Sequence, residues 1–299
     1  MSEATGVPSL RAGVIGVGAM GLGVARSLRR GGIATTVRDV RPEAEHAAAA
    51  FGAAVAASPA ALARAADVII IVVVDARQVE DVLFGADGVS ASGATERIVV
   101  LSSTVDPDFV VDVAHRLAAR GIALVDAPVS GGPARAHDGT LTIMAGGPRD
   151  ALARCRPLLD CMAQRVFEVG AAGDGARMKL ANNLLAAVHL AAAAEALSLA
   201  TRAGLDARLA GAVIGASSGA SWIVEDRLPR ALAHDLQPPR AAARILAKDA
   251  ALAADYARRR GLATPFTDEA RRAFDAIVAA GHGEDDDAVL LARALGRVG

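Results

Sequence analysis

Aromatic residues are scarce in this chain, which has six phenylalanines, one tryptophan and one tyrosine among 299 residues. A platform that stacks nucleic-acid bases needs more aromatic side chains, so that class of binding site is excluded. Lys and Arg total 32 against 33 Asp and Glu, and this balance supplies no broad positive surface for nucleic acid or an anionic membrane. The 53% of hydrophobic residues is enough for a sizeable core and argues against disorder.

Cysteine and long apolar runs are also scarce. Cys155 and Cys161 have neither a metal-binding spacing nor a disulfide framework, and the six histidines are scattered, so no metal site is predicted. The clearest apolar runs, at 68–74 and around 184–194, are shorter than the roughly 20 residues of a spanning helix. Residues 1–13 lack the basic start and apolar stretch of a secretory signal, so we expect a cytoplasmic protein.

Short β-branched segments alternate with helical ones in the first half of the chain. Strands are predicted at 14–17, 34–37, 68–74, 98–101 and 122–125, and further strands at 141–145 and 166–169. Their near-continuous apolar character is typical of a parallel sheet that is covered on both faces. Ser58-Pro59 and Asp106-Pro107 each place a capping oxygen before a proline, which predicts two helix starts. The alternation favours a doubly wound α/β domain.

The composition changes after the glycine-rich segment 170–175. Residues 176–203 contain neither proline nor glycine and predict one helix of roughly 42 Å. Beyond it, glycines and prolines separate further helical stretches. We therefore predict a Rossmann-type dinucleotide-binding domain at 1–174 and an all-helical domain for substrate binding and oligomerisation at 175–299, joined by the long helix. The acidic run 284–287 is interpreted as a solvated helix start, because carboxylates favour the first turn.

A glycine-rich turn follows the first predicted strand. Gly16, Gly18 and Gly21 form the pattern G-x-G-x-x-G, in which the glycines allow a tight turn, approach to a pyrophosphate and close helix packing. The helix that begins there would present its positive end to the anion. Asp39 lies 21 residues after Gly18, where a carboxylate can accept the ribose hydroxyls. The alternative is a purely structural turn, but this context favours a nicotinamide dinucleotide.

The choice between NAD and NADP depends on the residues around Asp39. Its carboxylate would repel a 2′-phosphate, which favours NAD. Arg38 and Arg41 flank it, however, and a nearby arginine is the usual way of accommodating NADP. We therefore expect NAD, with NADP as the alternative.

Lysine is the scarcest charged residue, since only Lys179 and Lys248 are present. Lys179 follows Gly175 by four residues in the first turns of the long helix, and Asn183 lies on the same face one turn later. A lysine that is partly desolvated in a cleft has a pKa below about 10.4 and can exchange protons near neutrality. The alternative is an ordinary solvated lysine. Lys248, next to Asp249, is interpreted from the residues alone as a solvated charge pair.

A second candidate segment follows the predicted strand that ends near Val125. Ser130, Gly131 and Gly132 offer a hydroxyl and exposed backbone N–H groups, which together suit a carboxylate. In an open α/β sheet, ligands bind outside the carboxyl ends of the strands. An ordinary Ser-Gly-Gly loop is the alternative.

Four segments taken together resemble the β-hydroxyacid dehydrogenase family, which includes 3-hydroxyisobutyrate dehydrogenase and tartronate semialdehyde reductase. They are GVIGVGAMG, DAPVSGGPARAHDGTLTIMAGG, GDGARMKLANN and ILAKDAALA, and the resemblance covers nearly the whole chain. It implies an oxidoreductase that transfers hydride between a short 3-hydroxycarboxylate and NAD or NADP, as a homodimer or homotetramer. Within the family, the chain is most similar to the L-threonate dehydrogenase branch, although Asn182-Asn183 match the hydroxyisobutyrate type.

The resemblance also implies roles for particular residues. Lys179 would be the general acid/base, Asn183 would touch the reacting hydroxyl, and Ser130, Gly131 and Gly132 would bind the substrate carboxylate. The implied cofactor-binding residues are Gly16, Gly18, Met20, Gly21, Asp39, Val73, Val74, Thr104 and Lys248. Two alternatives stay open: an imine reductase-type enzyme, which would lack the lysine, and a non-catalytic nucleotide-binding scaffold on the same fold.

Overall fold

The computed structural model describes residues 10–298, and the chain forms two compact units that meet between Lys179 and Leu180. The first unit is a mixed α/β domain, and the second is helical over its described residues, apart from one isolated bridge. The predicted fold class is therefore confirmed. Residues 1–9 lie outside the described residues, and they belong to the segment 1–13 in which the sequence shows no secretory signal.

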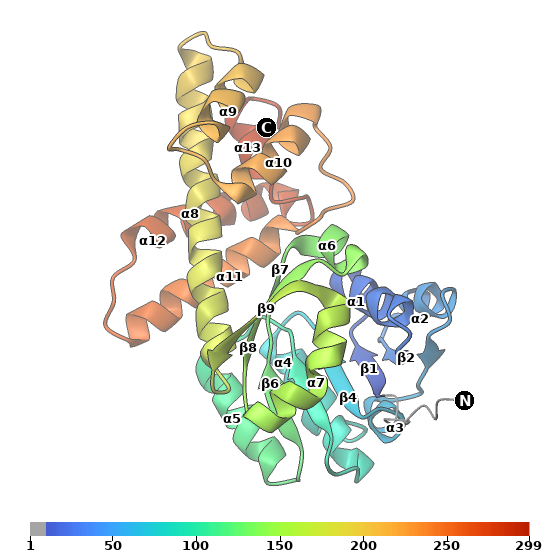
Figure 1. Ribbon diagram of the computed structural model, residues 1–299. Coiled ribbons are helices and arrows are strands. Elements are labelled where there is room, and N and C mark those ends of the chain that lie inside the picture. The colour runs from blue at the N-terminus through green and yellow to red at the C-terminus, as the bar shows by residue number, and fades with distance from the viewer. Residues whose placement is uncertain (1–9, 299) are drawn as a thin grey trace, which may run out of the picture. The chain divides into compact units, whose positions relative to one another are not determined.

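The first unit contains one nine-stranded sheet (Figure 1). Its strands are β1 (Arg11–Ile15), β2 (Ala34–Arg38), β3 (Ala54–Val55), β4 (Val68–Ile71), β5 (Ile98–Leu101), β6 (Ala123–Asp126), β7 (Val129–Ser130), β8 (Leu141–Gly146) and β9 (Ala163–Gly170). The order is β3-β2-β1-β4-β5-β6-β8-β7, with β9 on β8. The six strands from β3 to β6 in this order are parallel, and β8 runs antiparallel to β6 and β7.

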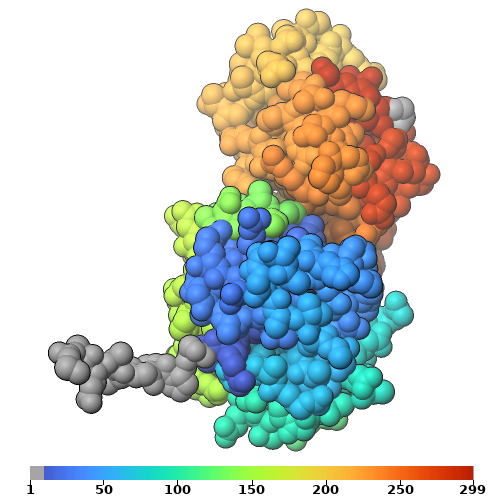
Figure 2. Space-filling view, turned by 90° about the vertical axis from the view of Figure 1, so that its right-hand side faces the viewer, coloured from blue at the N-terminus to red at the C-terminus, as the bar shows by residue number. Residues whose placement is uncertain are grey.

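Helices cover both faces of this sheet. They are α1 (Ala19–Arg30), α2 (Pro42–Ala49), α3 (Pro59–Ala65), α4 (Ala76–Phe84), η1 (Val89–Ser92), α5 (Pro107–Ala118), α6 (Gly132–Asp138) and α7 (Arg149–Met162). Ile70 points to the face packed by α1, α6 and α7, whereas Ile69 and Ile71 point to the face packed by α3, α4 and α5. Figure 2 shows the side where residues of α1 and α2, in blue, reach the surface. Burial on both faces explains why the strands are apolar throughout.

Most predicted strands are confirmed with shifted ends. Segment 98–101 coincides with β5, but segment 68–74 was predicted too long, because β4 ends at Ile71. Beyond that point the neighbouring strands have ended, and the N–H of Val73 donates to Ser103 Oγ at 2.9 Å instead of to a strand. β3 and β7 were not predicted, since two residues carry no recognisable alternation. The capping contacts of Ser58 and Asp106 are confirmed, with N–H donors at 3.1 and 2.8 Å.

The long helix α8 (Asp174–Arg202) has 29 residues and agrees with the predicted helix within two residues at its start and one at its end. By length and mean hydropathy it is the one described helix that could cross a membrane, which corrects the expectation that the apolar runs are too short. Leu190 and Leu197 are nevertheless fully buried in the apolar cluster of the second unit. The core helix of a soluble protein passes the same test of length and hydropathy, and 28% of the tested window of α8 is buried.

The remaining helices complete the second unit. They are α9 (Ala207–Gly215), α10 (Trp222–Ala233), α11 (Ala243–Arg259), α12 (Pro265–Ile277), η2 (Val278–His282) and α13 (Val289–Ala294). Phe274 of α12 and Leu291 of α13 are fully buried together with the α8 leucines. α10, in orange, lies beside the red C-terminal residues in Figure 2, in agreement with its contacts to α13.

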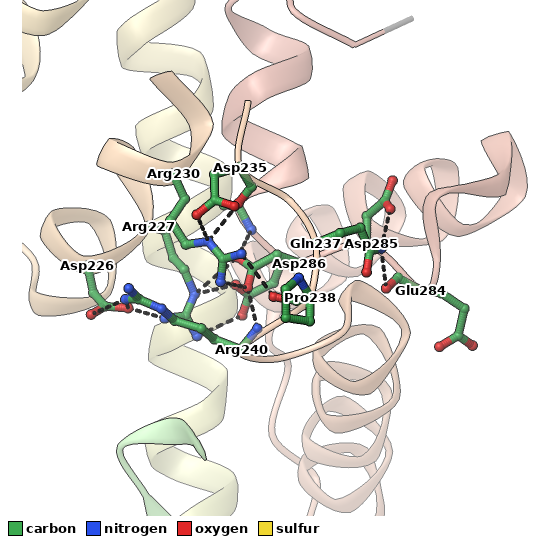
Figure 3. A network of polar contacts seen from close by, with 12 residues as sticks. Asp226, Arg227, Arg230, Asp235, Gln237, Pro238, Arg240, Glu284, Asp285 and Asp286 are labelled. Atoms are coloured by element: carbon green, nitrogen blue, oxygen red, sulfur yellow. Dashed lines mark hydrogen bonds and ion pairs between the residues drawn. The ribbon is translucent and has the colours of Figure 1, made fainter. Parts of the chain in front are cut away.

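An ion-pair network fixes α10 to the segment before α13 (Figure 3). Arg230 Nη1 lies 3.0 Å from Asp286 Oδ2, and Arg227 pairs with Asp287. Asp286 also accepts the backbone N–H groups of Arg240 and Ala288 at 2.6 and 3.1 Å. The two carboxylates are 0% and 2% exposed, so the interpretation of this acidic run as solvated was wrong at these positions. Buried charges of this kind require partners, and two arginines from α10 supply them.

Replacing Asp286 with Ala should strongly destabilise the second unit. The substitution removes the buried carboxylate that pairs with Arg230, leaves that guanidinium with the exposed carboxylate of Asp235 at 3.5 Å, and frees two backbone N–H groups. Removing one partner of a buried ion pair typically costs about 3–5 kcal/mol. Urea unfolding of the full chain, followed by the fluorescence of Trp222, measures the loss because this single tryptophan lies in the second unit.

Glu284→Ala is the matched control, since Glu284 pairs with Arg244 at 2.5 Å on the exposed surface. Exposed ion pairs contribute little, so this variant should unfold at nearly the wild-type urea concentration. An equal loss in both variants would contradict a special role for the buried network.

Candidate active site

The candidate site of the first unit lies where its parallel strands end. β1, β2, β4, β5 and β6 run in the same direction, so the residues that follow them meet at one edge of the sheet. β1 lies between β2 and β4, and the chain moves from β1 to one side and later crosses to the other. Ligands of open α/β sheets bind at such a reversal of strand order.

The glycine-rich turn has the geometry that its pattern predicted. Gly16 has φ +87°, and a Cβ atom there would lie 2.4 Å from the carbonyl oxygen of Val72. A Cβ atom on Gly21 would lie 1.8 Å from the carbonyl oxygen of Gly16. No larger side chain fits either position without displacing backbone. Gly18 precedes α1 directly, and Met20 follows in its first turn, partly buried against the core.

Asp39 is tied to this turn by its own hydrogen bonds. Its Oδ2 accepts the N–H of Val17 at 2.8 Å, and its Oδ1 accepts the N–H and Nε–H of Arg41 at 2.9 and 3.1 Å. Burial alone would raise the pKa of Asp39, but the bonds from Arg41 and Val17 outweigh it and lower that pKa. The carboxylate is therefore ionised at neutral pH and compensated by an adjacent guanidinium.

The segments after β4 and β5 are joined by a side-chain bond. Ser103, which is buried, accepts the Val73 N–H through its hydroxyl, and Val74 donates its N–H to Gln78 Oε1 at 2.9 Å. Thr104 follows Ser103 and is partly exposed. Val73, Val74 and Thr104 are thus held at the same edge of the sheet as the glycine-rich turn.

Ser130 lies in a short strand rather than in an open loop. β7 pairs antiparallel with β8, and Ser130 is opposite Thr142. Gly131 and Gly132 follow with φ values of 130° and 73°, which L side chains rarely adopt. A Cβ atom on Gly132 would meet nothing within 4 Å, so the backbone there is open to a ligand.

Lys179 lies on α8 at the end of the first unit and is 9% exposed. Lysines are almost never this buried without a partner, and Lys179 is not without one. The alternative of an ordinary solvated lysine is excluded by this burial. The helix that carries it begins at Asp174, five residues earlier, next to the end of β6.

The second unit holds the other predicted residues in a polar cluster. Asn183 is 6% exposed, and its Nδ2 donates to Asp249 Oδ2 at 2.6 Å. Lys248 Nζ lies 2.8 Å from Asp249 Oδ1. The Asp249 carboxylate therefore holds Asn183 of α8 and Lys248 of α11 together, and it was interpreted from sequence only as half of a solvated pair. Its burial, at 5% exposure, shows that this interpretation was wrong.

Two family models match consecutive parts of the chain. Residues 11–170 match the model described as the NAD binding domain of 6-phosphogluconate dehydrogenase. Residues 173–295 match the model described as NAD-binding of NADP-dependent 3-hydroxyisobutyrate dehydrogenase. An L-threonate dehydrogenase of Cupriavidus necator is 42% identical over 280 residues, covering 93% of this chain and 94% of that protein.

The chain belongs to the 3-hydroxyisobutyrate dehydrogenase-like family. A solved 3-hydroxyisobutyrate dehydrogenase from Salmonella typhimurium is 37% identical with a TM-score of 0.87, covering 94% of this chain and 99% of that one. The Mycobacterium tuberculosis 3-hydroxyisobutyrate dehydrogenase solved with L-serine is 31% identical with a TM-score of 0.83, covering 94% and 98%. The chain is thus an NAD(P)-dependent dehydrogenase of the hydroxyacid type, as the motifs implied.

The glycine-rich turn fits the dinucleotide of this family. The steric constraints at Gly16 and Gly21 are those of the tight turn and of close helix packing, and Gly18 lies between them at the start of α1, where a pyrophosphate would approach. Ser103 and Asp249 were missed as parts of the site. Neither has a local signal, because their partners Val73 and Asn183 lie 30 and 66 residues away in the chain.

Replacing Arg41 with Ala should weaken NADP binding more than NAD binding. The guanidinium of Arg41 is half-exposed beside Asp39, where it can reach a 2′-phosphate. Loss of one charge-assisted contact of about 1.5–3 kcal/mol corresponds to at least a ten-fold higher Kd for NADP. Fluorescence titration with NADPH and NADH measures both affinities, and the Kd of NADH should change less than three-fold.

Arg38→Ala is the control for this comparison. Arg38 lies on the other side of Asp39, but its guanidinium is already paired with Glu45 at 2.8 Å. Its removal should leave the ratio of the two affinities near the wild-type value. Equal weakening of NADPH and NADH by Arg41→Ala would show that Arg41 does not read the 2′-phosphate.

Proposed function

We propose that this dehydrogenase oxidises a short 3-hydroxycarboxylate, L-threonate or a 3-hydroxyisobutyrate-like acid, with Lys179 as the general acid/base. The observation that carries the proposal is the burial of Lys179 on the helix that begins beside the end of β6. When bound, the nicotinamide ring accepts the hydride that leaves the substrate carbon. The residues of the chain then have to bind, orient and deprotonate the alcohol.

The first unit supplies most of these roles. The hydroxyl of Ser130 and the backbone N–H groups of Gly131 and Gly132 hold the substrate carboxylate. Lys179 takes the hydroxyl proton as hydride leaves, and returns a proton in the reverse direction. An arginine cannot replace it, because a guanidinium is never deprotonated in a protein.

The second unit contributes Asn183 and Lys248 to the proposal. Asn183 lies one turn beyond Lys179 on the same continuous helix and therefore on the same face. Its amide is oriented by Asp249, so that it can hydrogen-bond the reacting hydroxyl. Lys248 would contact the dinucleotide. Met20, Asp39, Val73, Val74 and Thr104 would complete the cofactor contacts around the glycine-rich turn.

The relatives named for L-threonate and 3-hydroxyisobutyrate suggest which acids to test first. A panel of L-threonate, 3-hydroxyisobutyrate, glycerate and L-serine, followed at 340 nm with NAD and with NADP, compares their kcat/KM values. Cyclic imines with NADPH or NADH belong to the same panel. Reduction of an imine without oxidation of any hydroxyacid would favour the imine reductase alternative.

Lys179→Met should lower kcat by roughly 10²–10⁴-fold, the usual contribution of a positioned acid/base. Methionine matches the length of the lysine stem, so the binding of NADH should change little. Steady-state oxidation of the best acid in the panel gives kcat, and fluorescence titration gives the nucleotide Kd.

Arg202→Met serves as the control, because it removes a cation from the exposed end of the same helix. It should keep wild-type turnover. Near-normal kcat in Lys179→Met would remove the lysine from the mechanism.

A homodimer or homotetramer formed through the second unit, in the cytoplasm, is also proposed. Leu205, Leu209 and Val213 are spaced four residues apart around α9 and are each more than half exposed. A row of apolar side chains of this kind marks a protein contact surface. Light scattering of the purified chain should give two or four times its 30.2 kDa mass, and a monomeric mass would contradict the proposal.

A further inference from the structure

Asp126 is a buried carboxylate that the proposed mechanism does not use. It is the last residue of β6 and has no exposed surface. Its Oδ2 accepts the backbone N–H of Gly173 at 3.0 Å and that of Ala176 at 2.8 Å. These N–H groups lie just before and within the first turn of α8, where a helix has no internal acceptors for its donors. Asp126 therefore fixes the start of α8 to the end of β6.

The backbone contact at this point leaves no room for adjustment. A Cβ atom on Gly175 would lie 2.6 Å from the carbonyl oxygen of Asp126 and 2.5 Å from that of Met144. The first turn of α8 thus rests directly on the ends of β6 and β8. Two constraints of different kinds, a side-chain acceptor and a steric contact, hold the helix start in the same place.

The two parts of the proposed substrate site, the Ser130–Gly132 segment and Lys179, both follow this contact closely in the chain. Ser130 follows Asp126 by four residues, and Lys179 follows Ala176 by three residues on α8. We propose that Asp126 is a positioning residue, which sets where the amine of Lys179 lies relative to the Ser130–Gly132 segment by holding the first turn of α8. This inference rests on the proposed function of those residues.

The role needs a hydrogen-bond acceptor and does not need a negative charge. Burial raises the pKa of Asp126 to about 7, against the two N–H bonds that favour the charged form. Oδ1 has no hydrogen-bond partner among the described residues, so a proton there leaves Oδ2 free to accept both bonds. Asparagine can present its amide oxygen in the same way, whereas alanine cannot.

The test compares Asp126→Ala with Asp126→Asn in the full chain. Turnover is expressed per nucleotide-binding site, titrated with NADH, so that loss of folded protein does not count. Asp126→Ala should lower this kcat about ten-fold or more, since small misplacements of a reacting group are costly. The Kd of NADH should stay within about two-fold in both variants. Asp126→Asn should keep kcat within about three-fold of wild type.

Hydrogen–deuterium exchange gives a readout that is independent of activity. The peptide that contains residues 171–180 should exchange faster in Asp126→Ala and at the wild-type rate in Asp126→Asn, because only alanine frees the Gly173 and Ala176 N–H groups. Ser58→Ala is the matched control, since Ser58 accepts the Ala61 N–H at 3.1 Å at the start of α3, which carries no proposed site residue. It should leave kcat per site unchanged.

The outcomes separate this inference from the proposed function. If the wild-type protein oxidises no hydroxyacid, or if Lys179→Met keeps its activity, the proposed function is contradicted, and the inference about Asp126 is overturned with it. If both behave as proposed and Asp126→Ala keeps wild-type kcat per site, the inference alone is overturned. Should Asp126→Ala fail to fold, Gly175→Ala displaces the same helix start while keeping the acceptor, and unchanged turnover in that variant overturns the inference equally.

Discussion

The close contact between the first turn of α8 and the ends of β6 and β8 constrains the whole site of the first unit. A parallel sheet that is buried on both faces is a rigid platform, and its strand ends cannot shift independently. The first N–H groups of α8, which follows β9, must therefore find hydrogen-bond acceptors at the ends of these strands or stay unpaired. Asp126 provides the acceptor and Gly175 the space, so this residue pair holds the first turn of α8 against the sheet.

A similar close backbone contact joins α1, which follows the glycine-rich turn, to α6. Gly23 of α1 lies so close to α6 that a Cβ atom on it would be 2.7 Å from the backbone nitrogen of His137. One turn later on α1, Ser27 Oγ donates to the backbone carbonyl of Ala136 at 2.7 Å. α1 carries the glycine-rich turn at its start, and α6 follows the Ser130–Gly132 segment. The elements that would hold dinucleotide and substrate are thus in close contact, through the backbone at Gly23 and through one side-chain hydrogen bond from Ser27.

The elements with strong local patterns could be predicted from sequence, and those that depend on distant partners could not. The apolar segment 98–101 and the helix without glycine or proline were found because their signals are local. The end of β4 was misplaced because it depends on where β1 and β5 end. The acidic run was misread for a similar reason, since Arg227 lies 60 residues before Asp287.

The candidate site divides along the same line. The glycines and Asp39 could be proposed from sequence because the spacing of the glycine-rich turn and the acidic residue after the second strand is typical of dinucleotide binding. The pairing of Asp39 with Arg41 could not, because it depends on side-chain conformations that the spacing does not encode. The scarcity of lysine adds a chemical argument. Thirty of the 32 basic residues are arginines, and in the network around Asp286 they provide permanent charge. A lysine amine can give up its proton where an arginine cannot, and the two lysines lie on α8 and α11, each close in sequence to one partner of the Asn183–Asp249 hydrogen bond. The network around Asp286 uses guanidinium groups, whereas Lys179, the proposed acid/base, carries a group that can exchange its proton.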